Sequence, residues 1–95
     1  MEKTVEAYLR QQVRKSGGQA LKLVCPGWTG VPDRLILMPG GRAYFAETKD
    51  KGKSPKPRQR YIHDRLRELG FQVFVPDSKA AVDMMMICIT REAGG

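Results

Sequence analysis

The segment at residues 30–52 constrains the fold more than any other part of this sequence, because it holds two short apolar runs separated by a pair of glycines. Runs of this length around a glycine pair are typical of a β-hairpin. Charged residues nevertheless lie at its open ends: Asp33 comes where the first run begins, and Glu47 and Lys49 come where the second run ends. Charges in a hairpin that otherwise belongs to a core indicate a functional site.

The length of the turn decides whether Asp33 and Glu47 share a face of this hairpin. Side chains alternate along a strand, so Glu47 and Lys49 point one way and Thr48 points the other. A two-residue turn would pair Asp33 with Thr48, on the wrong face. A three-residue loop, with one residue added before or after the glycine pair, would pair Asp33 with Glu47 or with Lys49. We therefore predict the three-residue loop, or an Asp33 that lies just ahead of the strand.

Two carboxylates at the end of this hairpin would need a cation. At an effective dielectric constant of about 20, two charges a few ångströms apart repel by up to about 4 kcal/mol, and in a semi-buried site one would tend to stay protonated. Lys49 can offset part of this repulsion. Two carboxylates and a backbone carbonyl are also the ligands that Mg²⁺ or Mn²⁺ prefers, with positions left for water and a substrate phosphate. Such a metal can acidify a water and polarise a phosphorus centre, with Lys49 positioning or activating the attacking water.

The part of the chain before the hairpin predicts one helix and one strand. Residues 2–16 place Val5, Leu9 and Val13 on one face of a helix, which ends at a glycine pair. Residues 19–24 form a short strand, and the prolines and glycines that follow it are typical of a loop.

The part after the hairpin predicts a helix, a strand and a helix. The first helix begins near Pro57 and ends before Gly70, a strand covers residues 71–75, and Asp77-Ser78 caps the last helix. The inward stripes are Gln59, Ile62, Leu66 and Leu69 in the first of these helices, and Val82, Met85, Met86 and Ile89 in the second.

These elements together predict an α/β fold with the order αβββαβα. The first three strands form an antiparallel meander, and the fourth joins in parallel through a right-handed crossover over the helix at residues 57–69. The expected result is a mixed four-stranded sheet flanked by helices. Residues 1–95 are long enough for one domain and too short for two.

The net charge of +7 is concentrated on one segment. Only one acid, Asp50, accompanies the basic residues between positions 49 and 60. These basic residues are Lys49, Lys51, Lys53, Lys56, Arg58 and Arg60. Such a run is typical of a surface that meets an anionic polymer, and equally of a solvated, flexible loop.

Composition also excludes several classes of protein. The sequence has no apolar run long enough to span a membrane, and its start lacks the pattern of a signal peptide. We therefore expect a cytoplasmic protein with no membrane partner. Cys25 and Cys88 lie far apart with no further ligand at metal spacing, so we expect neither a zinc site nor a disulfide.

The motif residues resemble a known family. Residues 30–34 (Gly-Val-Pro-Asp-Arg) and 45–49 (Phe-Ala-Glu-Thr-Lys), together with Gln59 and Glu6, resemble the virus-type replication-repair nuclease (VRR-NUC) domain of the PD-(D/E)xK superfamily. The resemblance covers nearly the whole chain. It implies the restriction-endonuclease-like core of that superfamily, whose order of elements matches the order that periodicity predicts.

What the resemblance implies is a DNA endonuclease that depends on Mg²⁺ or Mn²⁺. Asp33 and Glu47 would be its metal ligands, with the backbone carbonyl of Thr48 as a third. Glu6, on the first helix, would assist at the metal directly or through a water. The alternative for Glu6 is an ordinary place on the helix surface.

Two further residues would complete the catalytic centre. Lys49 would act on the attacking water, and Gln59 would orient Lys49 or the phosphate, unless Gln59 is only a polar group at a helix start. His63 follows Gln59 by one helical turn and is a tempting base. Because a metal-activated water needs no base, we expect His63 to be an exposed or capping residue.

The same resemblance turns the basic segment into a DNA-binding surface. The residues expected to contact DNA are Arg34, Lys51, Lys53, Lys56, Arg58, Arg60 and Trp28. For Arg34 the alternative is an ion pair with an acid. Trp28 would either stack on an unpaired base or fill a dimer interface.

The family also implies partners. Its free-standing members of this size are associated with phages and bacteria, and they resemble Holliday-junction resolvases, which act as homodimers on branched DNA. We therefore expect a structure-selective nuclease of a bacterial cell, encoded by a phage or prophage. The alternatives are a nuclease that acts on flaps, nicks or linear duplex, and a non-catalytic nucleic-acid-binding module in which the acids only pair with basic residues.

Overall fold

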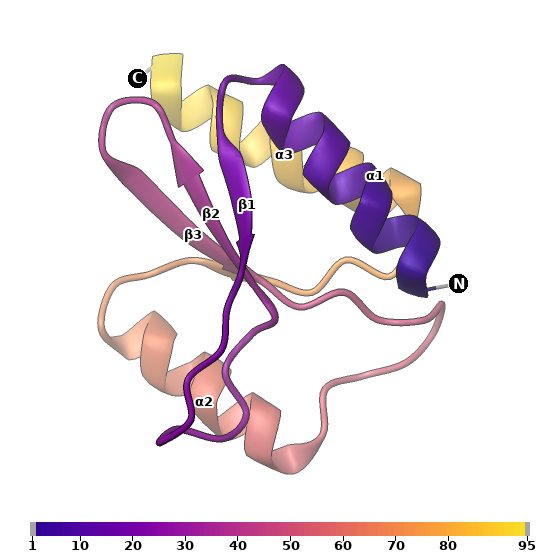
Figure 1. Ribbon diagram of the computed structural model, residues 1–95, viewed down its shortest axis with the longest axis vertical. Coiled ribbons are helices and arrows are strands. Elements are labelled where there is room, and N and C mark those ends of the chain that lie inside the picture. Colours follow the sequence, from indigo (N-terminus) through magenta and orange to yellow (C-terminus); the bar gives the residue numbers. More distant parts are fainter. Residues whose placement is uncertain (1, 95) are drawn as a thin grey trace.

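The structure is a computed structural model that describes residues 2–94, with the side chains of residues 3–92. Its elements follow the predicted order of helix, three strands, helix, strand and helix (Figure 1). They are α1 (Glu2–Lys15), β1 (Gln19–Lys22), β2 (Arg34–Met38), β3 (Arg42–Ala46), α2 (Pro57–Glu68), β4 (Val73–Phe74) and α3 (Lys79–Gly94).

The strands form one mixed sheet in the order β1-β2-β3-β4. The pairs β1–β2 and β2–β3 are antiparallel, whereas β3 and β4 run parallel and are connected through α2. The predicted mixed four-stranded sheet is therefore confirmed.

The two faces of the sheet are covered differently. Helices α1 and α3 share the main core with the face that carries Ile36 and Tyr44. On the opposite face, α2 and Val73 form a smaller cluster, against which Phe45 packs. Figure 1 shows α1 and α3 together on one side of the strands and α2 apart from them, beyond the open end of the hairpin.

The predicted helical faces are largely the faces that the protein buries. Val5, Leu9 and Val13 of α1 are at most 4% exposed, and the predicted stripe of α3 is also buried. Ser78 caps α3, because its Oγ accepts a hydrogen bond from the backbone N–H of Ala81 at 3.1 Å.

Two predictions for α2 are wrong. Leu69 is 53% exposed, because the helix ends at Glu68 and the chain turns away at Gly70, whose φ of +99° suits glycine. His63 is 1% exposed and is neither an exposed nor a capping residue, since it lies on the inward side of the helix between Ile62 and Leu66.

Two predicted strands are shorter than expected. The first ends at Lys22 rather than at residue 24, where the proline-containing loop begins. The fourth covers only Val73–Phe74 rather than residues 71–75. At its start, the N–H of Phe71 still donates to the carbonyl of Leu66 at the end of α2. Among the helices of residues 2–94, none is both long and apolar enough to cross a membrane.

Candidate active site

The length of the hairpin turn sets which residues face each other at the open end of the hairpin. Met38 pairs with Arg42, so the loop is the three residues Pro39, Gly40 and Gly41, and both glycines have positive φ. The last pair at the open end joins Arg34 to Ala46, and one further step in this register aligns Asp33 with Glu47. The predicted three-residue loop is therefore confirmed, and Asp33 lies just ahead of β2.

Asp33 is held by the two strands beside it. Its backbone carbonyl accepts a hydrogen bond from the N–H of Leu23 at 2.9 Å. Its two carboxylate oxygens accept long hydrogen bonds from the backbone N–H and the hydroxyl of Thr48, each at 3.3 Å. Burial raises the pKa of Asp33 above its ordinary value, although these hydrogen bonds and the charge of Arg34 act in the opposite direction. Burial therefore disfavours the ionised form of Asp33.

Lys49, at the end of the hairpin, contacts Gln59 on α2. Its Nζ lies 2.8 Å from Gln59 Oε1, to which it donates a hydrogen bond, and 3.8 Å from Glu47 Oε2. The backbones of Glu47 and Lys49 donate to the carbonyls of Phe74 and Pro76, so the parallel pairing with the β4 segment continues past the end of β3. Glu47, Lys49 and Gln59 are thus brought together, as the sequence predicts.

Gln59 has a second contact, which fixes its side-chain carbonyl. Oε1 also accepts the backbone N–H of Lys56 at 3.0 Å, at the start of α2. One oxygen atom therefore joins the ammonium of Lys49 to the end of the basic loop.

Glu6 lies on the inner part of α1, beside the start of β2. Its Oε1 accepts hydrogen bonds from the guanidinium of Arg34 and, at 2.8 Å, from Nε of Arg10. Arg34 also donates to the carbonyl of Ala20 at 3.3 Å, and its side chain is only 14% exposed. Arg34 is therefore in an ion pair with Glu6. This is the alternative that the sequence left open beside a contact with DNA phosphate.

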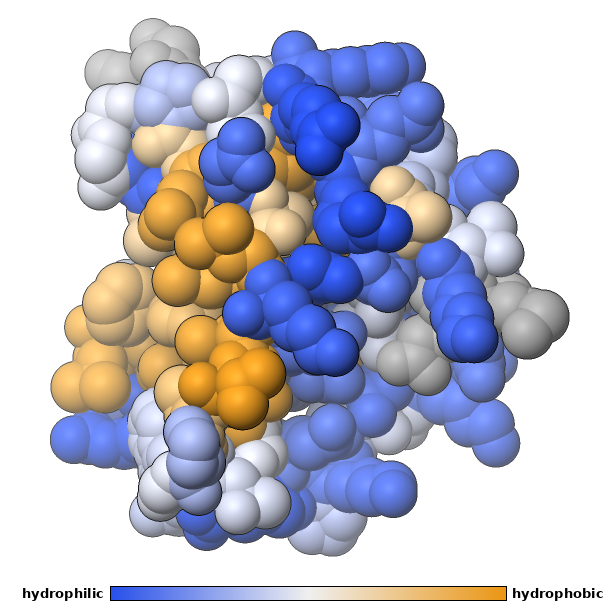
Figure 2. All heavy atoms as spheres, in the orientation of Figure 1, coloured by the Kyte–Doolittle hydropathy of each residue, from blue (hydrophilic) through white to orange (hydrophobic). Residues whose placement is uncertain are grey.

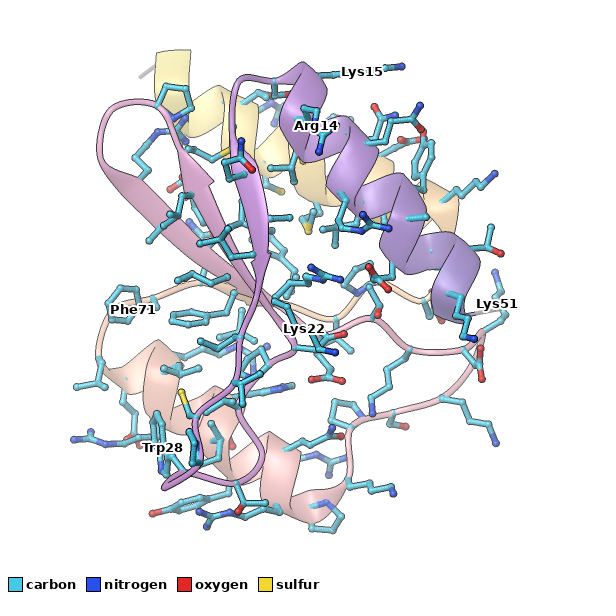
Figure 3. The ribbon with its side chains drawn as sticks, in the orientation of Figure 1. Arg14, Lys15, Lys22, Trp28, Lys51 and Phe71 are labelled. Carbon is cyan, nitrogen blue, oxygen red and sulfur yellow. The ribbon has the colours of Figure 1, made fainter. Side chains whose placement is uncertain are left out.

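The basic loop after β3 borders a hollow of about 400 Å³ next to Lys49. The residues that line it are Lys49, Asp50, Lys53, Ser54 and Lys56. Two hydrogen bonds hold the loop: the N–H of Gly52 donates to Asp77, and the N–H of Lys53 donates to the carbonyl of Asp50. Lys51, Lys53 and Lys56 are exposed, and Figure 3 shows the Lys51 side chain extending outward from the loop.

Two of the residues predicted to contact DNA, Trp28 and Arg58, make contacts within the protein. Trp28 packs against the small cluster of α2 and β4, and in Figure 3 it lies beside α2. Arg58 donates to the carbonyl of Thr29 at 2.9 Å and lies 5.3 Å from the centre of the Tyr61 ring. Arg60 is exposed.

His63 is the part of the site that sequence reasoning missed. Burial lowers its pKa, and the positive charges of Arg67 and Lys49 lower it further, so the ring is neutral at pH 7. Within the described residues its Nε2 has no hydrogen-bond partner. Its position one turn after Gln59 was the available signal, because residues four apart share a helical face.

Side chains alone do not provide enough ligands for a metal ion at this site. Among the described residues, no group of three or more His, Cys, Asp or Glu side chains is arranged to hold a metal ion. The donors that remain are two carboxylates, a backbone carbonyl and water. This donor set suits a hard cation such as Mg²⁺ or Mn²⁺, which keeps several waters.

Two of the known proteins that resemble this chain point to a nuclease. No family model matches the sequence. A protein of Acyrthosiphon pisum secondary endosymbiont phage 1, named "Putative nuclease p44", is 49% identical over 78 residues, which are 82% of this chain and 84% of the phage protein. A solved structure described as a VRR_NUC domain superposes with a TM-score of 0.86 at 36% identity, covering 90% of this chain and 92% of its own.

Proposed function

The chain belongs to the VRR-NUC family of nucleases in the PD-(D/E)xK superfamily, and we propose that it is a metal-dependent endonuclease that hydrolyses phosphodiester bonds in branched DNA. The observation that carries this proposal is the register of the hairpin. Its three-residue loop aligns Asp33 with Glu47 and leaves Lys49 within hydrogen-bond distance of Gln59.

The metal is held by the hairpin ends. Asp33, Glu47 and the backbone carbonyl of Thr48 would be its ligands. Glu6 would act through a water, because Arg34 and Arg10 already contact one of its carboxylate oxygens. When bound, Mg²⁺ or Mn²⁺ supplies an acidified water and neutralises charge on the phosphate.

Lys49 and Gln59 orient the reacting groups. The Gln59 carbonyl fixes the Lys49 ammonium, which then orients the attacking water with its remaining N–H groups. The same carbonyl accepts the backbone N–H of Lys56 at the start of α2. The position of the Lys49 ammonium is therefore fixed relative to the end of the basic loop. Glu47 forms an ion pair with Lys49, so Gln59 and Glu47 both hold the ammonium group.

DNA approaches along the basic loop. The exposed ammonium groups of Lys51, Lys53 and Lys56, with Arg60, bind backbone phosphates beside the hollow next to Lys49. Phosphate contacts of this kind carry no sequence information, so this surface supports selection by DNA shape rather than by sequence.

The active form is a homodimer that joins through the part of the α2-side face of the sheet that stays exposed around Leu21 and Leu37. Register puts Leu21 and Leu35 on one face, and Leu37, 41% exposed, lies two positions further along β2. Phe71 continues this face, with its ring edge-on to Phe45 at 5.4 Å. Figure 2 shows apolar side chains gathered over the hairpin side of the molecule and hydrophilic ones over the other side. An open apolar face is typical of an interface.

The phage relative supports a phage- or prophage-encoded protein that acts in the bacterial cytoplasm. Two active sites in one dimer can cut opposed strands, which is what a four-way junction requires.

The proposal is tested on four-way junctions, flaps, nicked duplex and linear duplex, each with Mg²⁺, Mn²⁺ or a chelator. We expect cleavage of the junction that needs metal and that Asp33→Ala or Lys49→Ala lowers at least about a hundredfold, while DNA affinity changes little. Asp64→Ala and Lys15→Ala, exposed residues of the same types, are the matched controls and should cut at the wild-type rate. Cleavage by either site variant at the wild-type rate would refute the site. Binding without cleavage of any substrate would favour a non-catalytic module.

A further inference from the structure

Arg34 joins three elements directly beside the predicted metal site. It is the first residue of β2 and follows Asp33 in the chain. From this position it donates to Glu6 on α1 and to the carbonyl of Ala20 on β1. Its side chain is 14% exposed, whereas the lysines of the basic loop are exposed. A largely buried guanidinium with two such partners is placed to orient a neighbouring group rather than to meet a polymer at the surface.

The contacts of Glu6 use only one of its oxygen atoms. Arg34 and Arg10 both donate to Oε1, and within the described residues Oε2 has no hydrogen-bond partner. Hydrogen bonds to a charged donor fix the orientation of a carboxylate. Oε2 is therefore held in one orientation and is free to bind a water.

Each of the two terminal nitrogens of Arg34 makes its own hydrogen bond. Nη1 binds the carbonyl of Ala20 and Nη2 binds Glu6, whereas Nε is buried with no partner in the described part of the chain. A lysine could keep the charge but not both bonds, because its single ammonium lacks the planar fork.

We propose that Arg34 is a positioning residue, which fixes the carboxylate of Glu6 for a metal-bound water and does not bind DNA phosphate. This inference rests on the proposed function and assigns a new role within its site. A partner of this kind acts on metal affinity through the group that it orients, and losing it typically costs 10- to 100-fold.

The first test is a double-mutant cycle on Mn²⁺ binding by the DNA-free protein, measured by calorimetry. Arg34→Gln should weaken Mn²⁺ binding at least about tenfold, and Arg34→Lys should not restore it. In a Glu6→Gln background the same Arg34→Gln change should alter binding by less than about twofold, because the group that it orients is already lost. Full restoration by Arg34→Lys, or an equal effect in both backgrounds, would overturn the proposal. The equal effect would mean that Arg34 only supports the fold through Ala20.

Arg10→Gln is the matched control for loss of a guanidinium beside Glu6. Arg10 donates to the same oxygen, but its side chain is 49% exposed, and among the described residues its side chain makes no hydrogen bond outside α1. An exposed pair within one helix contributes little, so Mn²⁺ affinity should change by less than about threefold.

The second test separates Glu6 from DNA phosphate. The salt dependence of DNA affinity should keep its slope in Arg34→Gln, whereas Lys53→Gln should reduce the slope by about one. A slope that falls by about one in Arg34→Gln with unchanged Mn²⁺ binding would make Arg34 a phosphate contact. If the wild-type protein neither binds Mn²⁺ nor cuts DNA, the proposed function fails. If it does both but the cycle is additive, only the role of Arg34 fails.

Discussion

At the scale of single residues, the burial of Asp33 opposes the ionised form that a metal ligand needs. Its pKa is raised by burial, so the folded protein favours the protonated carboxyl. The folded state therefore binds this proton more readily than the unfolded state does. The resulting contribution to stability is fully present at low pH and is lost as pH rises through the raised pKa. At neutral pH the ionised carboxylate destabilises the metal-free protein.

Asp33→Asn should therefore raise the melting temperature of the metal-free protein at pH 7 to 8. The gain should shrink as pH falls toward about 4, where an ordinary aspartate becomes protonated. Added Mg²⁺ or Mn²⁺ should stabilise the wild type and not the variant. Thermal melts across pH, with and without metal, measure both effects. A variant less stable than the wild type at neutral pH would mean that the Thr48 hydrogen bonds outweigh the cost of burying the charge.

The residues that sequence reasoning places well are those whose neighbours are close in the chain. Glu47 and Lys49 share a face because strands alternate, and Asp33 joins them through the length of one turn. The pair of Glu6 with Arg34 spans 28 positions, and only the packing of α1 against β1 and β2 brings it together. His63 was misplaced for a different reason: it was weighed only as a catalytic base, whereas its place one turn after Gln59 indicates the inward side on which it is buried.

At the scale of elements, the loop before the hairpin is fastened to α2. Arg58 donates to the carbonyl of Thr29, and Gly30 packs against the same turn of the helix. A Cβ on Gly30 would lie 3.1 Å from the Arg58 carbonyl and 3.2 Å from Ile62, and its φ of +96° disfavours any other residue. Gln59 follows Arg58 on this turn, so the contact lies next to the residue that binds Lys49.

Gly30→Ala should destabilise the protein by about 1–3 kcal/mol through backbone strain and crowding. For a domain of this size, each kcal/mol lowers the melting temperature by about 4–8 °C. Gly27→Ala is the matched control in the same loop, because nothing lies within 4 Å of the added Cβ and its φ is not positive. Equal melting temperatures for the two variants would show that the loop is not fastened to α2.

At the scale of the whole molecule, charge and apolar surface are separated. The basic loop extends beside the predicted metal site, whereas the open face of the sheet carries exposed leucines (Figure 2). A chain with a net charge of +7 repels a second copy, so an interface has to avoid the basic surface. The apolar face meets this condition for the homodimer that we propose.

Leu37→Glu should therefore convert a dimer into a monomer, because each copy would bury an unpaired carboxylate in the interface. Light scattering after size-exclusion chromatography measures the mass, and cleavage of a four-way junction should change from paired cuts to single nicks. Met84→Glu is the matched control: Met84 is 61% exposed, but it belongs to α3, which packs on the other face of the sheet. A dimer that survives Leu37→Glu and dissociates with Met84→Glu would move the interface to α3. A monomeric wild type that still makes paired cuts would remove the need for a dimer.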